Sequence, residues 1–344
     1  MPVKKVGIVF GGQSGEHEVS LMSAESVIQF LPRDRYEPVL IGITKCGGWL
    51  TEGNPWEALK QGTKDPGGPA PTALLSSLDV IFPVLHGPYG EDGTIQGLFE
   101  MCGVAYVGAD VLASSIGMDK VIMKQIFRAN NFPIAAYTVA WRRHFEEDPE
   151  SVLEDIVAKL GLPVFVKPAN LGSSVGVSKA NDTAELAQAL KLACSYDRKV
   201  IVEEYIPCRE IECSVLGNDF PEASIIGEIV PHNEFYDYGA KYSEGGSDLL
   251  IPAPVPAAVS EEVRALAVAA FQAIDCSGMA RVDFFIHRDT GRVILNEINT
   301  IPGFTRYSMY PRLWQATGLS YPDLIDRLLV LALERFSDRR RNAT

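Results

Sequence analysis

The chain of 344 residues is 47% hydrophobic and 22% charged, a composition typical of a globular protein with room for two or three domains. Its formal net charge of -13 argues against a general nucleic-acid or anionic-membrane partner, and no apolar run approaches the length of a membrane span. The start predicts a strand followed by glycines rather than a signal peptide, and six cysteines without metal-ligand spacing indicate free thiols in a reducing cytoplasm.

The first third of the chain alternates between strand and helix patterns. Apolar runs at 6–10, 39–43 and 80–85 predict buried strands, while 18–31 and 94–101 predict helices. Because strands that alternate with helices form parallel sheets, we predict a doubly wound α/β domain here.

The middle third opens with a helix predicted over 119–130. Asp148-Pro149 and Gly161 bound a second helix, since Asp as the N-cap, Pro at the first position and Gly past the end are favoured there. Strands are predicted at 164–167, in the segment that ends at Lys179, and at 200–205, and Asp182 caps a helix to about residue 193.

The last third is rich in strands, predicted at 211–216 and 223–230, and it ends with a helix at 321–335. Ser260 is predicted to cap a helix that continues through 274. Residues 231–252 carry no clear strand or helix pattern but contain several aromatic residues and a Gly-Gly pair. Connections this long are often lids, so we expect a lid, with a merely mobile loop as the alternative.

A predicted hairpin near the C-terminus carries the strongest chemical signal. Its strands, 281–287 and 292–299, flank a three-residue loop that ends in Gly, which favours a hairpin with a bulge. In that register Arg288 pairs with Arg292, Asp283 lies opposite Glu297, and Arg281 lies opposite Asn299. Facing carboxylates repel each other unless a cation lies between them, and oxygen ligands of this kind suit magnesium. The alternative is a solvated polar face on which Arg281 neutralises the acids.

A Gly/Ser-rich loop at 172–176 follows the strand that ends in Lys167-Pro168. Its glycines let backbone amides approach a phosphate, its hydroxyls add donors, and Lys167 supplies a cation. The chain has no Gly-x4-Gly-Lys-[Ser/Thr] motif, which excludes a Walker-type loop. It also has no Gly-x-Gly-x-x-Gly after the first strand, which weakens a dinucleotide interpretation. Nucleotide phosphates need both cationic donors and a metal, so this loop and the hairpin together indicate a nucleotide site.

Several short motifs follow one another in a characteristic order. They are Gly11-Gly12-x-Ser14-x-Glu16-x-Glu18-Val19-Ser20, His86-Gly87-x3-Glu91-Asp92-Gly93, Met118-Asp119-Lys120, Val166-Lys167-Pro168, Gly172-Ser173-Ser174-Val175-Gly176, Tyr236-Asp237-Tyr238-x-x-Lys241-Tyr242, Arg281-x-Asp283, Asn296-Glu297-Ile298-Asn299-Thr300-x-Pro302-Gly303 and Ser308-Met309-Tyr310-Pro311. In this order they resemble the D-alanine–D-alanine ligase family of the ATP-grasp superfamily, over essentially the whole chain.

The resemblance implies an α/β fold, α+β in its ATP-grasp part, with three sections. A Rossmann-like, substrate-binding domain would occupy 1–119. The two halves of an ATP-grasp domain would occupy 120–208, with the phosphate loop, and 209–344, with the lid at 231–252 and the metal site. ATP would bind between these two halves.

The resemblance also assigns residues to ATP and to two Mg²⁺ (or Mn²⁺) ions. The nucleotide-binding residues would be Lys120, Lys167, Ser174 and Lys241 at the phosphates, Glu203, Glu204 and Ile206 at the adenine, and Glu210 at the ribose. The metal ligands would be Asp283, Glu297 and Asn299, which agrees with the argument from the hairpin.

The implied reaction joins two D-alanines through a D-alanyl phosphate and supplies the dipeptide for peptidoglycan synthesis. Glu16 would bind the first ammonium group, and Arg281 with the Gly303 amide would face the oxyanion. Ser308, with Met309 beside it, would receive the second carboxylate. Ser173 and Tyr242 would link Glu16 to the lid, and His86 would contact the substrate.

Other interpretations remain at this stage. Singly, Glu16 could be an acid favoured at a helix start and His86 a buried structural histidine. The rivals are another ATP-grasp carboxylate–amine ligase, including one that accepts D-lactate, and a non-catalytic nucleotide-binding protein. A nicotinamide-dependent oxidoreductase is disfavoured by the missing glycine motif. Lys241-Tyr242 resemble the dipeptide-forming type. The resemblance implies a cytoplasmic homodimer that acts on D-alanine and ATP, with no nucleic-acid or membrane partner.

Overall fold

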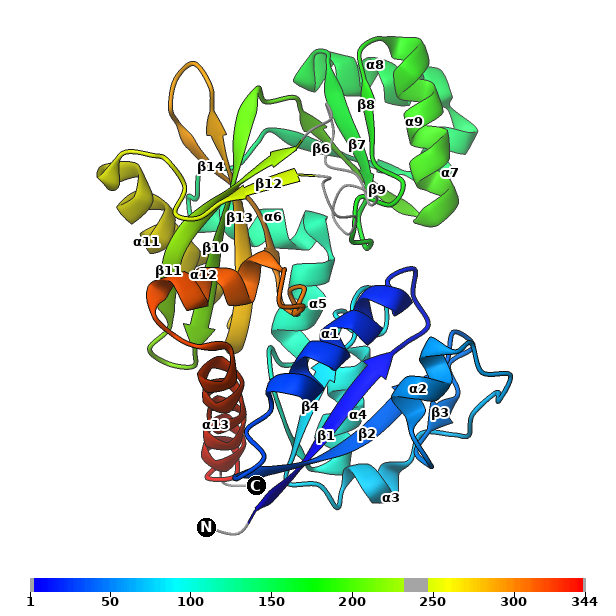
Figure 1. The fold of residues 1–344 in the computed structure, drawn as a ribbon. Helices are drawn as coiled ribbons and strands as arrows, with labels where there is room; N and C mark the ends of the chain where they lie inside the picture. Colours follow the sequence, from blue (N-terminus) through cyan, green and yellow to red (C-terminus); the bar gives the residue numbers. More distant parts are fainter. Residues whose placement is uncertain (1–2, 232–246, 343–344) are drawn as a thin grey trace.

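The computed structural model describes residues 3–231 and 247–342, which form three sheets with helices packed on them (Figure 1). The first sheet and its neighbours comprise β1 (Lys4–Gly11), α1 (His17–Phe30), β2 (Tyr36–Ile43), β3 (Trp49–Leu50), α2 (Pro55–Lys60), α3 (Thr72–Leu75), β4 (Val80–Val84), α4 (Thr94–Cys102), β5 (Ala105–Tyr106) and α5 (Val111–Met118). Strand order is β3-β2-β1-β4-β5, and β2, β1, β4 and β5 run parallel. The predicted parallel α/β domain is therefore confirmed.

Both faces of the first sheet are buried, as a doubly wound sheet requires. Phe10 and Phe82 contribute to a core on one face, and Val9 and Ile81 to a core on the other. The last helix, α13 (Tyr321–Arg339), packs on the first of these faces together with α1, so the end of the chain returns to its beginning (Figure 1).

The second sheet is antiparallel, with strand order β6-β9-β7-β8. Its section comprises α6 (Lys120–Ala129), β6 (Tyr137–Trp141), α7 (Arg142–Glu147), α8 (Pro149–Leu160), β7 (Val164–Pro168), β8 (Ser178–Ala180), α9 (Thr183–Tyr196) and β9 (Lys199–Glu204). The predicted caps are confirmed, because Asp148 accepts from the Ser151 amide at 3.1 Å and Asp182 from the Glu185 amide at 2.8 Å. Helices α8 and α9 bury one face of this sheet, while Lys167 and Glu203 lie on the other.

The third sheet is also antiparallel, with strand order β12-β11-β10-β13-β14. It comprises β10 (Cys208–Gly217), β11 (Glu222–Pro231), β12 (Ser247–Leu250), α11 (Ala257–Ala273), β13 (Gly278–His287), β14 (Val293–Asn299) and α12 (Met309–Thr317). Helix α11 and residues of α6 share its core, in which Phe127, Phe271 and Phe284 are buried.

Two predictions of secondary structure in this last third are wrong. Residues 231–252 contain β12, which pairs with β11 although its short sequence has no strand pattern of its own. The pairing partner, not local propensity, makes this strand. Helix α11 begins at Ala257 after Pro256, so Ser260 lies inside the first turn and does not cap it.

The hairpin register is confirmed where it concerns the candidate site. Asp283 lies opposite Glu297, and Arg281 lies opposite Asn299. The pairing of Arg288 with Arg292 is wrong, because the His287 amide bonds to the Arg292 carbonyl at 3.0 Å and the loop holds one more residue. Strand β14 has a bulge at Asn296, which adds one unpaired residue to that strand. This extra residue offsets the longer loop, so Asp283 still pairs with Glu297 as predicted.

The first two sheets lie in the predicted sections 1–119 and 120–208, and the third begins at Cys208, one residue before the predicted section 209–344; the section boundaries stay a prediction. In residues 3–231 and 247–342, no helix combines the length and the apolar character needed to cross a membrane.

Candidate active site

A cavity of ≈ 1380 Å³ lies where the three sheets meet. Every predicted site residue within the described part of the chain lines it: Glu16, His86, Lys120, Lys167, Ser173, Ser174, Glu203, Glu204, Ile206, Glu210, Arg281, Asp283, Glu297, Asn299, Gly303, Ser308 and Met309. Lys241 and Tyr242 lie outside the described residues. These side chains come from segments far apart in the sequence, so their convergence supports a single site.

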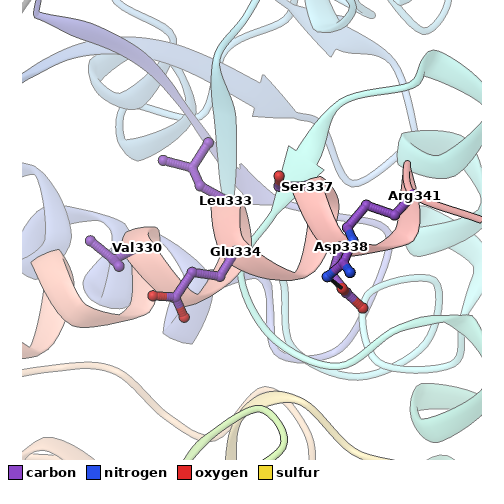
Figure 2. A pocket seen from close by; sticks show the side chains of 6 residues that line it. All are labelled: Val330, Leu333, Glu334, Ser337, Asp338 and Arg341. Carbon is purple, nitrogen blue, oxygen red and sulfur yellow. Dashed lines mark hydrogen bonds and ion pairs between the residues drawn. The ribbon is translucent and has the colours of Figure 1, made fainter.

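A second hollow runs along α13 and is shallow. Figure 2 shows its lining residues, which belong to that helix and, for Arg341, to the turn just after it: Val330, Leu333, Glu334, Ser337, Asp338 and Arg341. The one ion pair among them, Arg341 with Asp338 at 3.0 Å, is largely exposed. No predicted site residue lines this hollow, so the large cavity is the candidate active site.

The loop between β1 and α1 delivers Glu16 to the cavity. Gly11 has φ +91, and a Cβ there would lie 2.2 Å from the Ile43 carbonyl oxygen, so the turn requires glycine. The Ser14 hydroxyl donates to the His86 carbonyl at 2.7 Å and accepts from the Glu16 amide at 3.1 Å. Glu16 is buried, and the Ser173 hydroxyl donates a hydrogen bond to its carboxylate. Glu16 does not cap α1 with its side chain, which weighs against a purely structural role.

His86 is buried between the first sheet and the loop after β14. Its Nε2 lies 2.9 Å from the Ser23 hydroxyl and its Nδ1 lies 3.1 Å from the Ile301 carbonyl oxygen. Burial lowers the pKa of His86, although the negative charge of Glu16 acts in the opposite direction. Both ring nitrogens are thus engaged by protein groups, and the predicted contact with substrate stays a prediction.

Glu91 is a cavity residue to which the sequence analysis assigned no role. Its Oε2 accepts from the Gly87 amide at 2.7 Å. Burial, reinforced by the nearby charge of Glu16, raises the pKa of the Glu91 carboxyl to about 8. Its place in the His86-Gly87-x3-Glu91 motif was the available signal, but a motif position alone does not reveal that two carboxylates meet.

The cationic end of the cavity contains Lys120 and Lys167. Asp119 caps α6 by accepting from two amides at 3.1 Å, which places Lys120 at the helix start with its Nζ 2.5 Å from the Leu171 carbonyl oxygen. The adjacent Ser173 and Ser174 have φ values of +49 and +58, a left-handed turn that is uncommon outside glycine. Backbone and hydroxyl donors are therefore gathered beside two ammonium groups, which is an anion-binding arrangement.

The Glu203 carboxylate forms ion pairs with two lysines. Lys124 Nζ lies 2.6 Å from Oε1, and Lys167 Nζ lies 2.6 Å from Oε2. Burial opposes ionisation of Glu203, but the two ammonium groups outweigh it and lower its pKa to about 2. Burial likewise opposes the charge on Lys167, and Glu203 with Glu297 outweighs it and raises the pKa of Lys167. The sequence analysis did not identify Lys124.

The predicted adenine pocket follows β9. The Glu204 carboxylate accepts from the Ala136 amide at 2.7 Å, and its own amide donates to the Ala136 carbonyl at 3.0 Å, so its side chain holds the chain before β6. Ile206 packs with Ala135 and Ile294, which forms an apolar surface next to the polar cavity. Such a surface suits a flat heterocycle.

Three carboxylates lie side by side across the third sheet. Glu212 on β10 pairs with Asp283 on β13, which pairs with Glu297 on β14. Arg281 contacts Asp283 through Nε to Oδ1 at 2.7 Å and Nη2 to Oδ2 at 2.8 Å, and Glu212 at 3.0 Å. Burial opposes the charge of Arg281, but these acids raise its pKa well above the usual value. Arg281 therefore neutralises charge on Asp283 and Glu212, the role that the alternative interpretation of the hairpin gave it.

The hairpin also offers the oxygen donors that a hard cation needs. Asn299 Nδ2 donates to Asp283 Oδ2 at 2.9 Å, so the amide and both predicted carboxylates lie together. Among the described residues, no group of three or more His, Cys, Asp or Glu side chains has the arrangement of a metal site. A carboxylate oxygen has more than one lone pair, however, so Asp283 can accept from Arg281 and still ligate a cation. The residues fit Mg²⁺ as two carboxylates with an amide oxygen.

The loop after β14 forms the remaining wall. Ser308 Oγ lies 2.8 Å from Thr305 Oγ1 and accepts from the Thr305 amide at 3.1 Å, which fixes its hydroxyl. A Cβ at Gly303 would lie 3.0 Å from that same hydroxyl oxygen. Arg306 is exposed, with its guanidinium over the Tyr307 ring at 4.6 Å, and does not line the cavity.

Comparison with known proteins identifies the family. The model of the D-ala D-ala ligase N-terminus matches residues 5–109, and that of the D-ala D-ala ligase C-terminus matches residues 126–330. The chain belongs to the D-alanine–D-alanine ligase family. It is therefore an ATP-dependent ligase, and the predicted ATP-grasp fold is confirmed.

Relatives of this ligase match it over nearly their full length. The D-alanine--D-alanine ligase of Acetivibrio thermocellus is 50% identical over 97% of each chain, and that of Thermoanaerobacter sp. is 51% identical over 99% of each. Among solved structures, the D-alanine-D-alanine ligase from Coxiella burnetii has a TM-score of 0.85 and 33% identity over 98% of this chain and 96% of that one. The VanG D-Ala:D-Ser ligase from Enterococcus faecalis also has a TM-score of 0.85, with 35% identity over 96% of this chain and 100% of that one.

Proposed function

We propose that this ligase uses ATP to join two D-alanines through a D-alanyl phosphate, and so supplies the dipeptide for peptidoglycan synthesis. The observation that carries the proposal is the convergence on one cavity of Glu16, two lysines and Arg281, each from a different part of the fold. A carboxylate for an ammonium group, cations for phosphates and a guanidinium for an oxyanion are the groups that this reaction needs. The names of the relatives agree with it.

In the first step the donor D-alanine is activated. Glu16, oriented by the Ser173 hydroxyl, binds the donor ammonium group. A carboxylate oxygen of the donor attacks the γ-phosphorus, an O–P bond forms, the bond to the bridging oxygen breaks, and ADP leaves. Lys120, Lys167 and Ser174 hold the phosphates, while Glu203, Glu204 and Ile206 surround the adenine and Glu210 holds the ribose. Activation is needed because a carboxylate is a poor electrophile and its oxide a poor leaving group.

Asp283, Glu297 and Asn299 would hold two Mg²⁺ (or Mn²⁺) ions on the face of the hairpin that lines the cavity. When bound, these ions supply positive charge that offsets the phosphate oxygens during transfer. The Arg281 contact keeps the Asp283 carboxylate oriented toward the cavity.

In the second step the acceptor amine attacks the activated carbonyl. A C–N bond forms, and the tetrahedral intermediate collapses as the C–O bond to the phosphate breaks. Inorganic phosphate leaves and takes with it the proton that the nitrogen gives up. Arg281 and the Gly303 amide face the developing oxyanion, and preorganised donors of this kind usually give the largest catalytic term. Ser308, whose hydroxyl is fixed by Thr305, receives the acceptor carboxylate, with Met309 beside it. His86 lies at the wall near the donor site.

D-alanine is the proposed acceptor because the relatives near 50% identity are named for it. D-serine and D-lactate are the competing acceptors, the first because a structural neighbour is named a D-Ala:D-Ser ligase. Lys241 and Tyr242, predicted to meet the γ-phosphate and the acceptor, lie outside the described residues and keep those roles as predictions. We also propose that the ligase acts in the cytoplasm as a homodimer.

The test is phosphate release from Mg-ATP with D-alanine, with D-alanine plus D-serine, with D-alanine plus D-lactate, and with no amino acid, each product mixture being identified by mass spectrometry. Release that depends on D-alanine, with D-alanyl-D-alanine as the main product in every mixture, is the expected result. A mixed product as the main species would reassign the acceptor. Release without any ligated product, or ATP binding without release, would favour the non-catalytic alternative.

A further inference from the structure

A buried ion pair lies just behind the phosphate end of the cavity. Lys124 on α6 is 1% exposed and does not line the cavity, yet its Nζ lies 2.6 Å from Glu203. Glu203 is therefore the counter-ion of Lys124. Lys167 reaches the same carboxylate from the cavity side, with 14% of its side chain exposed.

The two lysines differ in their surroundings. Lys124 is held by α6, whose Met123 and Phe127 are buried in the core of the third sheet. Lys167 lies on β7 at the cavity, where Glu297 and Glu210 also attract its charge. The Lys124–Glu203 pair therefore joins α6, which packs on the third sheet, to β9 of the second sheet, and Lys167 is the member of the cluster that faces the cavity.

A lysine that binds a phosphate must loosen its contact with the carboxylate that holds it. Leaving Glu203 buried without a counter-ion would be strongly unfavourable, because an unpaired charge in the interior loses its hydration. A second, fixed ammonium group on the other carboxylate oxygen removes that penalty. A carboxylate shared by two cations also holds each of them less tightly than it would hold one.

We infer that Lys124 is a positioning residue, the fixed counter-ion of Glu203 that leaves Lys167 available to the nucleotide phosphates. This inference rests on the proposed role of Lys167 at the phosphates. It predicts that Lys124 affects ligands that carry phosphates and not those that lack them, although it touches neither.

The experiment compares the binding of ADP and adenosine by calorimetry at one magnesium concentration, in the full chain. In Lys124→Met, Glu203 retains Lys167 as its remaining cation, so ADP should bind about tenfold more weakly while adenosine is unchanged within about twofold. Lys159→Met is the matched control, since Lys159 forms an exposed pair with Asp155 at 2.7 Å, and both affinities should stay at the wild-type values.

The double variant Lys124→Met/Glu203→Gln removes the carboxylate as well as its counter-ion. Its ratio of ADP to adenosine affinity should return to the wild-type ratio or exceed it. Equal losses for ADP and adenosine in Lys124→Met would overturn the inference, because a merely structural role weakens both. If the single variant does not fold, the double variant decides, and a tenfold fall in its ratio would overturn the inference. Failure of the wild-type chain to bind ADP would instead overturn the proposed function, and this inference with it.

Discussion

The hydroxyl of Ser173 donates a hydrogen bond to the carboxylate of Glu16, 157 positions earlier in the chain. The bond connects the phosphate loop after β7 with the loop that leads into α1, and both residues line the cavity. Ser173 has φ +49, a conformation that costs a non-glycine residue about 1 kcal/mol and needs support from its surroundings. The contact thus links the proposed donor site to the proposed phosphate site.

Ser173→Ala should raise the KM for the donor D-alanine roughly tenfold, because Glu16 loses the group that orients its carboxylate. The measurement is steady-state kinetics at saturating ATP, with ADP affinity determined in parallel. Ser195→Ala is the control, since that exposed hydroxyl donates to the Leu192 carbonyl of its own helix at 2.6 Å. A loss of ADP affinity larger than the loss for D-alanine would move Ser173 from the donor site to the nucleotide.

Asp283→Asn and Glu297→Gln should each lower turnover at least about 10- to 100-fold, because a neutral amide is a poorer ligand for Mg²⁺ and no longer balances Arg281. Activity as a function of magnesium concentration is the measurement, and the dependence should shift to higher concentrations. Asp289→Asn, in the exposed loop of the same hairpin, should leave the turnover and its magnesium dependence unchanged. Wild-type activity in either site variant would remove the metal assignment.

Gly87→Ala should impair the donor site, because a Cβ there would lie 2.9 Å from a carboxylate oxygen of Glu16. Gly87 has φ +78, so the substitution also strains the backbone. Gly62→Ala carries a matched strain at φ +71 but meets open space, and it should lower stability without affecting activity. Comparing kcat/KM for D-alanine in the two variants separates the effect of backbone strain from the effect of the steric clash with Glu16. Equal kcat/KM values in both variants would contradict the placement of Glu16.

Glu91→Gln should change the pH dependence of stability. With a folded pKa of about 8 and an ordinary value of 4.5, the folded chain holds a proton on Glu91 that the unfolded chain has released. Glu91 makes its full contribution to the free energy of unfolding below pH 4.5, and this contribution is lost as the pH rises toward 8. The variant should therefore gain on the order of 1–4 kcal/mol relative to wild type between pH 5 and 8.5.

Urea unfolding at several pH values measures this difference. The lowered pKa of His86 acts in the opposite direction, since a neutral buried histidine loses stability as pH falls. His86 is present in both proteins, so comparing them isolates Glu91. A difference between the two proteins that does not vary with pH would show that the Glu91 carboxyl titrates normally.

Much of the fold and of the strand pairing in the hairpin at 281–299 could be predicted because the deciding interactions are local. Alternation along a strand determines which side chains share a face, and Asp283 lies opposite Glu297 as predicted because the bulge at Asn296 offsets a loop one residue longer than expected. Capping residues likewise marked the starts of α8 and α9. Strand β12 and the true start of α11 escaped prediction because packing partners, rather than their own residues, decide them.

The candidate site shows the same difference between local features, which the sequence predicts, and features that depend on packing. Short motifs in order were enough to indicate the family, the cationic loop and the oxygen ligands, because each depends on neighbours within a few residues. The bond from Ser173 to Glu16 joins loops of two different sheets, and the shared carboxylate of Glu203 brings a lysine of α6 to the second sheet. The raised pKa of Glu91 needs burial and the nearby charge of Glu16. Burial and contacts between segments far apart in the sequence arise only when the chain packs, so only the tertiary structure decides them.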